Sequence, residues 1–157
     1  MTNQEFAARV MAMKQKLFHV AYGLLRDPSD QEDAVSEAIG KALLKRTKLR
    51  DERAFEGWLM RILINECHAI GRRKARELPV AELPERITPK DANPELHDAI
   101  LALPEALREV VILHYMDGYP LEAVGTMLRL PLGTVKTRLM RARGQLRTLL
   151  TEEARRK

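Results

Sequence analysis

Hydrophobic residues recur at alternating steps of three and four along most of the chain, the spacing of an amphipathic α-helix. The first such stretch carries Phe6, Val10, Met13, Leu17, Val20 and Leu24. Asp27-Pro28 predicts where this first helix ends, because proline lacks the amide donor that a helix needs. No segment shows the period of two that marks a half-buried strand. The pattern therefore predicts an all-α protein.

Two more helices are expected in the N-terminal half. The second should start at the capping residues Ser29 and Asp30. Its buried face should consist of Ala34, Val35, Ala38, Ile39, Ala42 and Leu43. The third should run from about Glu52 to Arg73, with an apolar side formed by Leu59, Ile62, Leu63 and Ile70. On it, we expect Trp58 to pack in the core and His68 to lie on the surface.

Prolines mark the helix starts in the C-terminal half. Asn93-Pro94 is a cap followed by proline at the first helical position, and Leu96, Ile100 and Leu103 follow in phase. The next helix should open at Pro104, bury Leu107, Val110, Val111 and His114, and stop at Gly118. A short helix should then run from Pro120 to about Leu128, and a long one should start near Gly133. The core side of this last helix should be Val135, Leu139, Ala142, Leu146 and Leu149.

Pro79, Pro84, Pro89 and Pro94 interrupt the hydrophobic pattern at every fifth residue. Such a stretch favours an extended linker. The expected organisation is therefore two small helical domains, residues 1–76 and 94–157, joined by a Pro-rich linker at 77–93.

Composition narrows the functional classes. With 45% hydrophobic and 31% charged residues the chain is globular. The single cysteine, Cys67, excludes an internal disulfide and a paired-cysteine zinc site, and neither a signal peptide nor a membrane span is expected, which favours the cytoplasm. The four histidines are scattered, and no nucleophile, phosphate loop or metal spacing accompanies them. We therefore expect no enzyme activity, no metal or cofactor and no small-molecule substrate.

The net charge of +5 hides blocks of opposite sign. Residues 41–76 carry +7 (11 basic, 4 acidic) and residues 133–157 carry +6 (8 basic, 2 acidic), whereas residues 27–38 carry five acidic side chains and no basic one. Basic blocks of this kind favour contact with phosphate, although two solvated helix faces would give the same counts.

The last two expected helices have the layout of a helix-turn-helix, a short helix and a turn followed by a helix that is basic in its first turns. On a helical wheel, Lys136, Thr137, Met140, Arg141 and Gly144 lie opposite the core side. Arginine and lysine can pair with guanine, and threonine or methionine can contact neighbouring base edges. Arg138 and Arg143 lie at the flanks, where they would meet the DNA backbone. An ordinary helical hairpin with a solvated basic face is the alternative.

The run Gly133-Thr134-Val135-Lys136-Thr137-Arg138, followed by Arg141-Ala142-Arg143, resembles region 4 of the sigma-70 family, which reads the minus-35 promoter element. The resemblance implies that Lys136, Thr137, Met140 and Arg141 face the bases, the same four that the wheel selects. Arg129 stands where the family has Gly, Asn or Asp in the turn, and Pro120 replaces a Ser-type cap. An altered turn is therefore expected.

Trp58-Leu59, Ile62 and Asn65 resemble the signature of region 2 of the same family, and with only regions 2 and 4 the chain resembles a sigma factor of the extracytoplasmic-function type. The family has Asp or Asn where this chain has Ala69. Arg61, Asn65, His68 and Arg72 form a polar stripe suited to phosphates and an exposed base. The resemblance implies that Asn65 and the preceding loop capture an unstacked base of the minus-10 element. The loop residues concerned are Leu49, Arg50, Asp51, Glu52 and Arg53.

On the second helix the acidic side carries Asp30, Asp33, Glu37 and Lys41. Acidic groups at a helix start also interact favourably with its dipole, which could by itself explain Asp30 and Asp33. The resemblance implies that this side docks on core RNA polymerase, and that an anti-sigma factor is a further partner.

The sequence thus predicts a promoter-specificity subunit that binds core RNA polymerase and promoter DNA. The alternatives are a helix-turn-helix regulator that never touches polymerase and a sigma-like decoy that binds an anti-sigma factor but not DNA. Retention of Lys136, Arg138, Arg141 and Arg143 argues against the decoy.

Overall fold

The computed structural model describes residues 1–77 and 93–156, and within these ranges the regular structure is helical. The chain divides into two compact units, Met1–Pro84 and Glu85–Lys157. The expected Pro-rich linker lies mostly outside the described residues.

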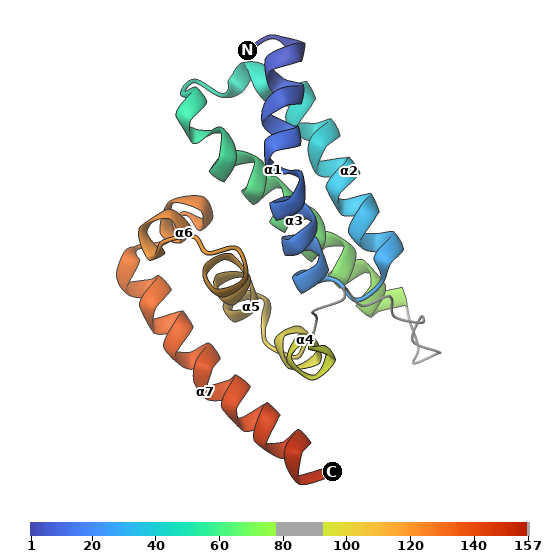
Figure 1. Ribbon diagram of the computed structural model, residues 1–157, viewed down its shortest axis with the longest axis vertical. Helices are drawn as coiled ribbons and strands as arrows, with labels where there is room; N and C mark the ends of the chain where they lie inside the picture. The colour runs from blue at the N-terminus through green and yellow to red at the C-terminus, as the bar shows by residue number, and fades with distance from the viewer. Residues whose placement is uncertain (78–92, 157) are drawn as a thin grey trace. The chain divides into compact units, whose positions relative to one another are not determined.

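The first unit is a three-helix bundle of α1 (Asn3–Leu24), α2 (Pro28–Lys45) and α3 (Phe55–Glu77) (Figure 1). Each helix contacts the other two. The six apolar positions predicted for the first helix are all buried, which confirms that stripe. At its start Thr2 and Glu5 form a reciprocal capping box, with bonds of 3.1 and 3.0 Å.

The start of α2 differs from the prediction. Asp27, not Ser29 or Asp30, caps the helix, and its carboxylate accepts a hydrogen bond of 2.9 Å from the Ser29 amide. Pro28 takes the first helical position, where its missing N–H costs nothing. Of the predicted buried face, Ala34, Val35, Ala38 and Ala42 are buried, whereas Ile39 is only half-buried and Leu43 is 38% exposed.

In α3 the buried face is rotated slightly from the predicted one. Leu59, Leu63 and Ile70 are buried as expected, but Ile62 is only half-buried, and Met60, Ile64 and Cys67 complete the core. Burial raises the pKa of the Cys67 thiol to about 12, so this cysteine is held neutral. The prediction that His68 lies on the surface is wrong, since its side chain is only 7% exposed. His68 lies one helical turn after the buried Ile64 and directly after the buried Cys67, so it shares the buried side of α3.

Two short 3₁₀ turns, Arg46–Lys48 and Glu52–Ala54, connect α2 to α3. Phe55 opens α3 and packs edge-on against Phe6 with ring centroids 5.8 Å apart. Trp58 lies 5.9 Å from the Phe55 ring and is half-buried, so it packs at the margin of the core.

The second unit comprises α4 (Pro94–Leu101), α5 (Glu105–Val111), a π-helical turn (Ile112–Met116), α6 (Leu121–Leu128) and α7 (Leu132–Arg156). The long α7 contacts α4, α5 and α6 (Figure 1). Asn93 caps α4 through hydrogen bonds to the Glu95 and Leu96 amides, as predicted.

Four consecutive residues are buried where α5 passes into the π-helical turn, from Val110 to Leu113. The π-helical turn begins at Ile112, and a π-helix is wound more widely than an α-helix. Beyond it, the Tyr119 amide donates a hydrogen bond of 3.0 Å to the Leu113 carbonyl. His114 is half-buried rather than buried, and its Nδ1 lies 2.8 Å from the backbone carbonyl oxygen of Tyr119.

Candidate nucleic-acid interface

The turn between α6 and α7 is tight and left-handed at one residue. Arg129 has φ 57° and ψ 47°, a conformation that glycine adopts without cost and other residues rarely adopt. The Leu130 amide bonds the Gly125 carbonyl at 2.8 Å, and the Arg129 amide bonds the Thr126 carbonyl at 3.3 Å. This is the Schellman ending of a helix, formed with arginine at the glycine position. Arg129 thus adopts the left-handed conformation that glycine usually takes in such a turn, and the hydrogen bonds of the turn are kept.

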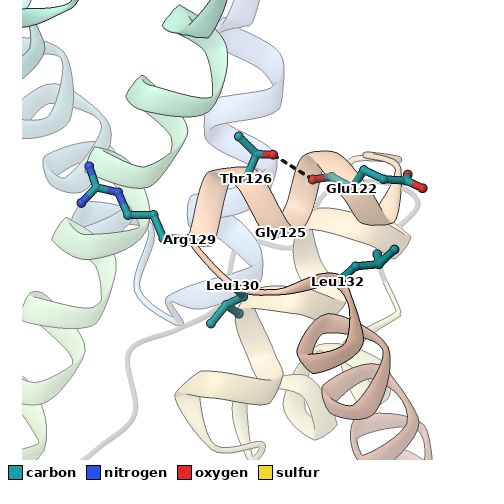
Figure 2. Close-up of a pocket in the computed structure, with 6 residues that line it drawn as sticks. All are labelled: Glu122, Gly125, Thr126, Arg129, Leu130 and Leu132. Atoms are coloured by element: carbon teal, nitrogen blue, oxygen red, sulfur yellow. Dashed lines mark hydrogen bonds between the residues drawn. The ribbon is translucent and has the colours of Figure 1, made fainter.

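Gly125 is required by the same turn. A Cβ at this position would lie 2.8 Å from the Leu130 carbonyl oxygen, closer than atoms can approach. A shallow hollow of about 280 Å³ opens beside the turn (Figure 2). The Arg129 side chain points away from Leu130 and Leu132, toward solvent.

The two sides of α7 divide as the helical wheel predicts. Val135, Leu139 and Ala142 are buried, whereas Leu146 and Leu149 are only half-buried. The predicted base-facing side chains Lys136, Thr137, Met140 and Arg141 are all exposed. Met140 is 65% exposed. The tertiary structure therefore leaves this face available to a partner.

The two flanking arginines of α7 differ in environment. Arg138 is half-buried, and its Nη1 lies 3.8 Å from the Glu109 carboxylate of α5. Arg143 is exposed and donates a hydrogen bond from Nε to the Tyr115 hydroxyl, and its Cζ lies 5.4 Å from the centre of that ring. Neither Glu109 nor Tyr115 is evident from the helix-turn-helix pattern, because both come from the preceding helical segment.

The polar stripe predicted on α3 is only partly at the surface. Asn65 and Arg72 are exposed, Arg61 is half-buried and His68 is buried. Arg72 is tied to its own helix, since its Nε donates to the His68 carbonyl at 3.2 Å.

The predicted minus-10 loop lies at the N-terminal end of α3. Leu49 is half-buried, and Arg50 through Arg53 are exposed. Two of its acidic groups have partners: Arg9 binds both the carbonyl and the carboxylate of Glu52, and Asp51 accepts bonds from the Arg53 amide and side chain. Asn65 lies about 15 Å further along the α3 axis than Phe55, so the structure does not gather the loop and Asn65 at one point.

The acidic side of α2 is divided between internal and external roles. Asp30 is paired with Lys74 of α3 at 2.8 Å, and Lys74 also reaches Asp27 at 3.3 Å. The hydrogen bond with Asp30 is the main reason that the pKa of Lys74 is raised. Asp33 and Glu37 are exposed, so they are the acidic groups that the fold leaves facing outward.

Lys41 forms an ion pair with Glu66 of α3. This bond is the main cause of a raised Lys41 pKa, and it explains why an acidic residue stands next to the buried Cys67. The pair lies in an open groove of about 580 Å³ between α2 and α3. The groove is lined by Asp33, Ser36, Glu37, Gly40, Lys41, Glu66, Ala69, Ile70 and Arg73.

Sequence reasoning missed one apolar feature of α2. Leu44 is 84% exposed and Leu43 is partly exposed, although both stand in a helix of the bundle. No signal in the pattern marks this exposure, because Leu24 and Leu25, also adjacent, are both buried.

The described residues contain no cluster of three or more His, Cys, Asp or Glu side chains able to hold a metal ion. Among the same residues, no helix is both long and apolar enough to span a bilayer.

Together, a helix-turn-helix with an exposed basic face and a separate three-helix unit define a two-unit helical protein of the DNA-binding class. Comparison with known families makes the class specific. Residues 10–77 match the family model of sigma-70 region 2, and residues 94–146 match that of sigma-70 region 4.

The chain belongs to the sigma-70 family and is a promoter-specificity factor of RNA polymerase, of the extracytoplasmic-function type. It is 30% identical to the ECF RNA polymerase sigma factor SigW of Bacillus subtilis, over 94% of this chain and 89% of that protein. It is also 30% identical to the RNA polymerase sigma-H factor of Pseudomonas aeruginosa, over 88% of this chain and 82% of that protein.

Solved structures agree. The sigma factor RpoE from Bartonella quintana, in complex with the anti-sigma factor NepR, has a TM-score of 0.75 and 26% identity, covering 94% of this chain and 98% of that one. CnrH in complex with the cytosolic domain of CnrY has a TM-score of 0.74 at 22% identity, covering 96% of this chain and 90% of that one, which shows a common fold.

Proposed function

We propose that the two units divide promoter recognition between them. The exposed face of α7 reads the minus-35 duplex through Lys136, Thr137, Met140 and Arg141. The observation that carries this proposal is that these four side chains are exposed on one side of α7 while Val135, Leu139 and Ala142 are buried on the other. In the major groove, methionine can contact the methyl group of thymine, and lysine or arginine can pair with the O6 and N7 acceptors of guanine.

The first unit acts on the minus-10 element. Asn65 offers an amide to an exposed base, Arg61 and Arg72 of the same helix contact phosphates, and the loop from Leu49 to Arg53 contacts the strand separately, at the N-terminal end of α3. Flipping a base out of the duplex costs a few kcal/mol, so the contacts to it must return a comparable amount. Of the two arginines in the loop, Arg50 is the better placed to contact phosphate, because Arg53 already forms an ion pair with Asp51.

Core RNA polymerase docks on the acidic side of α2. Asp33 and Glu37 support this part of the proposal because they are exposed, whereas Asp30 and Lys41 are already paired with α3. The protein acts in the cytoplasm and performs no covalent chemistry itself. An anti-sigma factor holds it inactive, as one is bound to the Bartonella quintana relative.

Run-off transcription with purified core polymerase on a promoter library tests the proposal. We expect initiation from promoters that share two spaced elements. The docking site is tested by the double variant Asp33→Ala and Glu37→Ala. It should lose binding to core polymerase while keeping the helix content of the wild type. DNA binding without any complex with core polymerase would instead indicate a helix-turn-helix regulator that acts alone.

A further inference from the structure

The two arginines at the flanks of the exposed face of α7 have partners of different chemistry. Arg138 lies beside the Glu109 carboxylate, and both side chains are largely shielded, at 28% and 16% exposed. Arg143 lies over the Tyr115 ring and bonds its hydroxyl through Nε. One arginine therefore meets an anion and the other a neutral phenol.

This difference decides what each arginine can offer DNA. The Glu109 carboxylate partly compensates the charge of Arg138, although at 3.8 Å it is too far away to accept a hydrogen bond from the guanidinium. A phenol leaves the full positive charge in place. A guanidinium has five N–H donors, and the bond to Tyr115 occupies only Nε. Among the residues that the structure describes, no acceptor is found for the terminal NH₂ groups of Arg143, which form the fork that suits phosphate.

Tyr115 is itself held in place. It belongs to the π-helical turn after α5, and its ring packs edge-on against His114 with centroids 4.9 Å apart. His114 is anchored in turn by Nδ1, 2.8 Å from the Tyr119 carbonyl. A π-turn often marks a functional position, and here it presents a half-exposed tyrosine beside the DNA-facing helix.

We propose that Tyr115 is a positioning residue that holds Arg143 ready for a phosphate of the promoter duplex, and that Arg138 is an internal tie between α7 and α5 rather than a DNA contact. The proposal rests on the proposed reading of the minus-35 element by α7. Holding a long side chain in one geometry before binding reduces the conformational entropy lost on contact with DNA.

The test uses the complete protein bound to core polymerase and measures its affinity for a set of promoters that differ in the minus-35 element, each over a range of salt concentrations. Arg143→Ala should weaken binding equally on all promoter sequences and reduce the slope of log affinity against log salt by about 0.9, the value for one phosphate contact. Tyr115→Phe keeps the ring but loses the hydroxyl, so it should weaken binding about three- to tenfold. In the Arg143→Ala background the same tyrosine change should have no effect.

Arg138→Ala is the matched control, because it removes an equal charge from the same helix. It should lower the thermal stability of the protein and leave the salt slope unchanged. The proposal is overturned if Arg138→Ala reduces the slope as much as Arg143→Ala, or if Tyr115→Phe weakens binding equally with and without Arg143. Unchanged affinity after Arg141→Ala and Lys136→Ala would contradict the underlying proposal for α7 instead.

Discussion

At the scale of single residues, the turn before α7 shows how a local rule can be broken without loss of the fold. Arg129 occupies a left-handed position that favours glycine, and both Schellman hydrogen bonds still form. At Gly125, by contrast, any residue with a Cβ would clash with the Leu130 carbonyl oxygen. One position of the turn thus tolerates a side chain at a cost, and the other does not tolerate one.

Arg129→Gly should therefore stabilise the protein by about 1 kcal/mol, since a left-handed conformation costs a non-glycine residue about that much. Thermal and urea unfolding would measure the change. Gly125→Ala is the opposite control and should destabilise by about 1–3 kcal/mol through overpacking. A loss of stability in Arg129→Gly would show that the arginine side chain supports the turn.

Replacing Arg141 by alanine should relax the preference at one base pair of the minus-35 element. A good arginine–guanine pair contributes about 1–3 kcal/mol of discrimination. Affinities for a set of single-base promoter variants measure this, with Arg155→Ala, an exposed charge near the end of α7, as the control. A uniform loss over all sequences would show that Arg141 contacts phosphate.

At the scale of elements, α3 combines the core of the first unit with its proposed DNA contacts. Asn65 is exposed on the same helix that buries Leu63, Ile64 and Cys67, so its position is fixed by the packing of its neighbours. A rigid helix is a more accurate support for an amide than a loop is.

Asn65→Ala should slow or weaken strand opening at the minus-10 element while duplex binding by the second unit stays intact. Permanganate reactivity of unpaired thymines reports opening, and affinity for a minus-35 duplex reports binding. Gln15→Ala, an exposed amide on α1, is the control. Wild-type opening by the Asn65 variant on both supercoiled and linear templates would contradict the role.

The ties between α2 and α3 predict a dependence on alkaline pH. The pKa of Lys74 is raised above its ordinary 10.5, chiefly by its hydrogen bond with Asp30. A pKa raised by folding means that the stabilisation is complete below 10.5 and is lost as the pH rises through the raised value.

The protein should therefore be more stable than a Lys74→Met variant at neutral pH, by about 1 kcal/mol or less because the pair is partly exposed. The difference should shrink when the pH exceeds the raised value. Urea unfolding of both proteins across this range measures it, and a difference that persists in strong alkali would show that Lys74 acts through packing rather than charge.

At the scale of the whole molecule, charge is distributed in segments of opposite sign along the chain. The net charge of +5 contains a +7 segment at 41–76, a +6 segment at 133–157 and a +3 segment at 1–26, offset by −5 at 27–38, −5 at 77–109 and −1 at 110–132. Binding to DNA should follow the local segments, because screened charges act over only about 10 Å.

Two variants with the same change in net charge test whether DNA binding depends on the local charged segments or on the net charge of the whole chain. In the complex with core polymerase, Lys136→Ala should lower the affinity for the promoter and reduce its salt dependence, whereas Lys14→Ala, which removes an exposed lysine on α1, should leave both unchanged. Equal effects of the two substitutions would mean that net charge governs binding.

The amino-acid sequence by itself determined the helical class, the apolar stripe of α1, the asparagine cap of α4 and the division of α7 into a buried and an exposed side. These are consequences of periodicity and short-range capping, which depend on neighbours only a few residues away. Only the tertiary structure decided which polar groups are committed internally. It paired Asp30 with Lys74, Lys41 with Glu66, Arg138 with Glu109 and Arg143 with Tyr115, and it buried His68. Each of these depends on a partner helix or on the exact rotation of α3 within the bundle, and a helical wheel drawn for one segment contains neither.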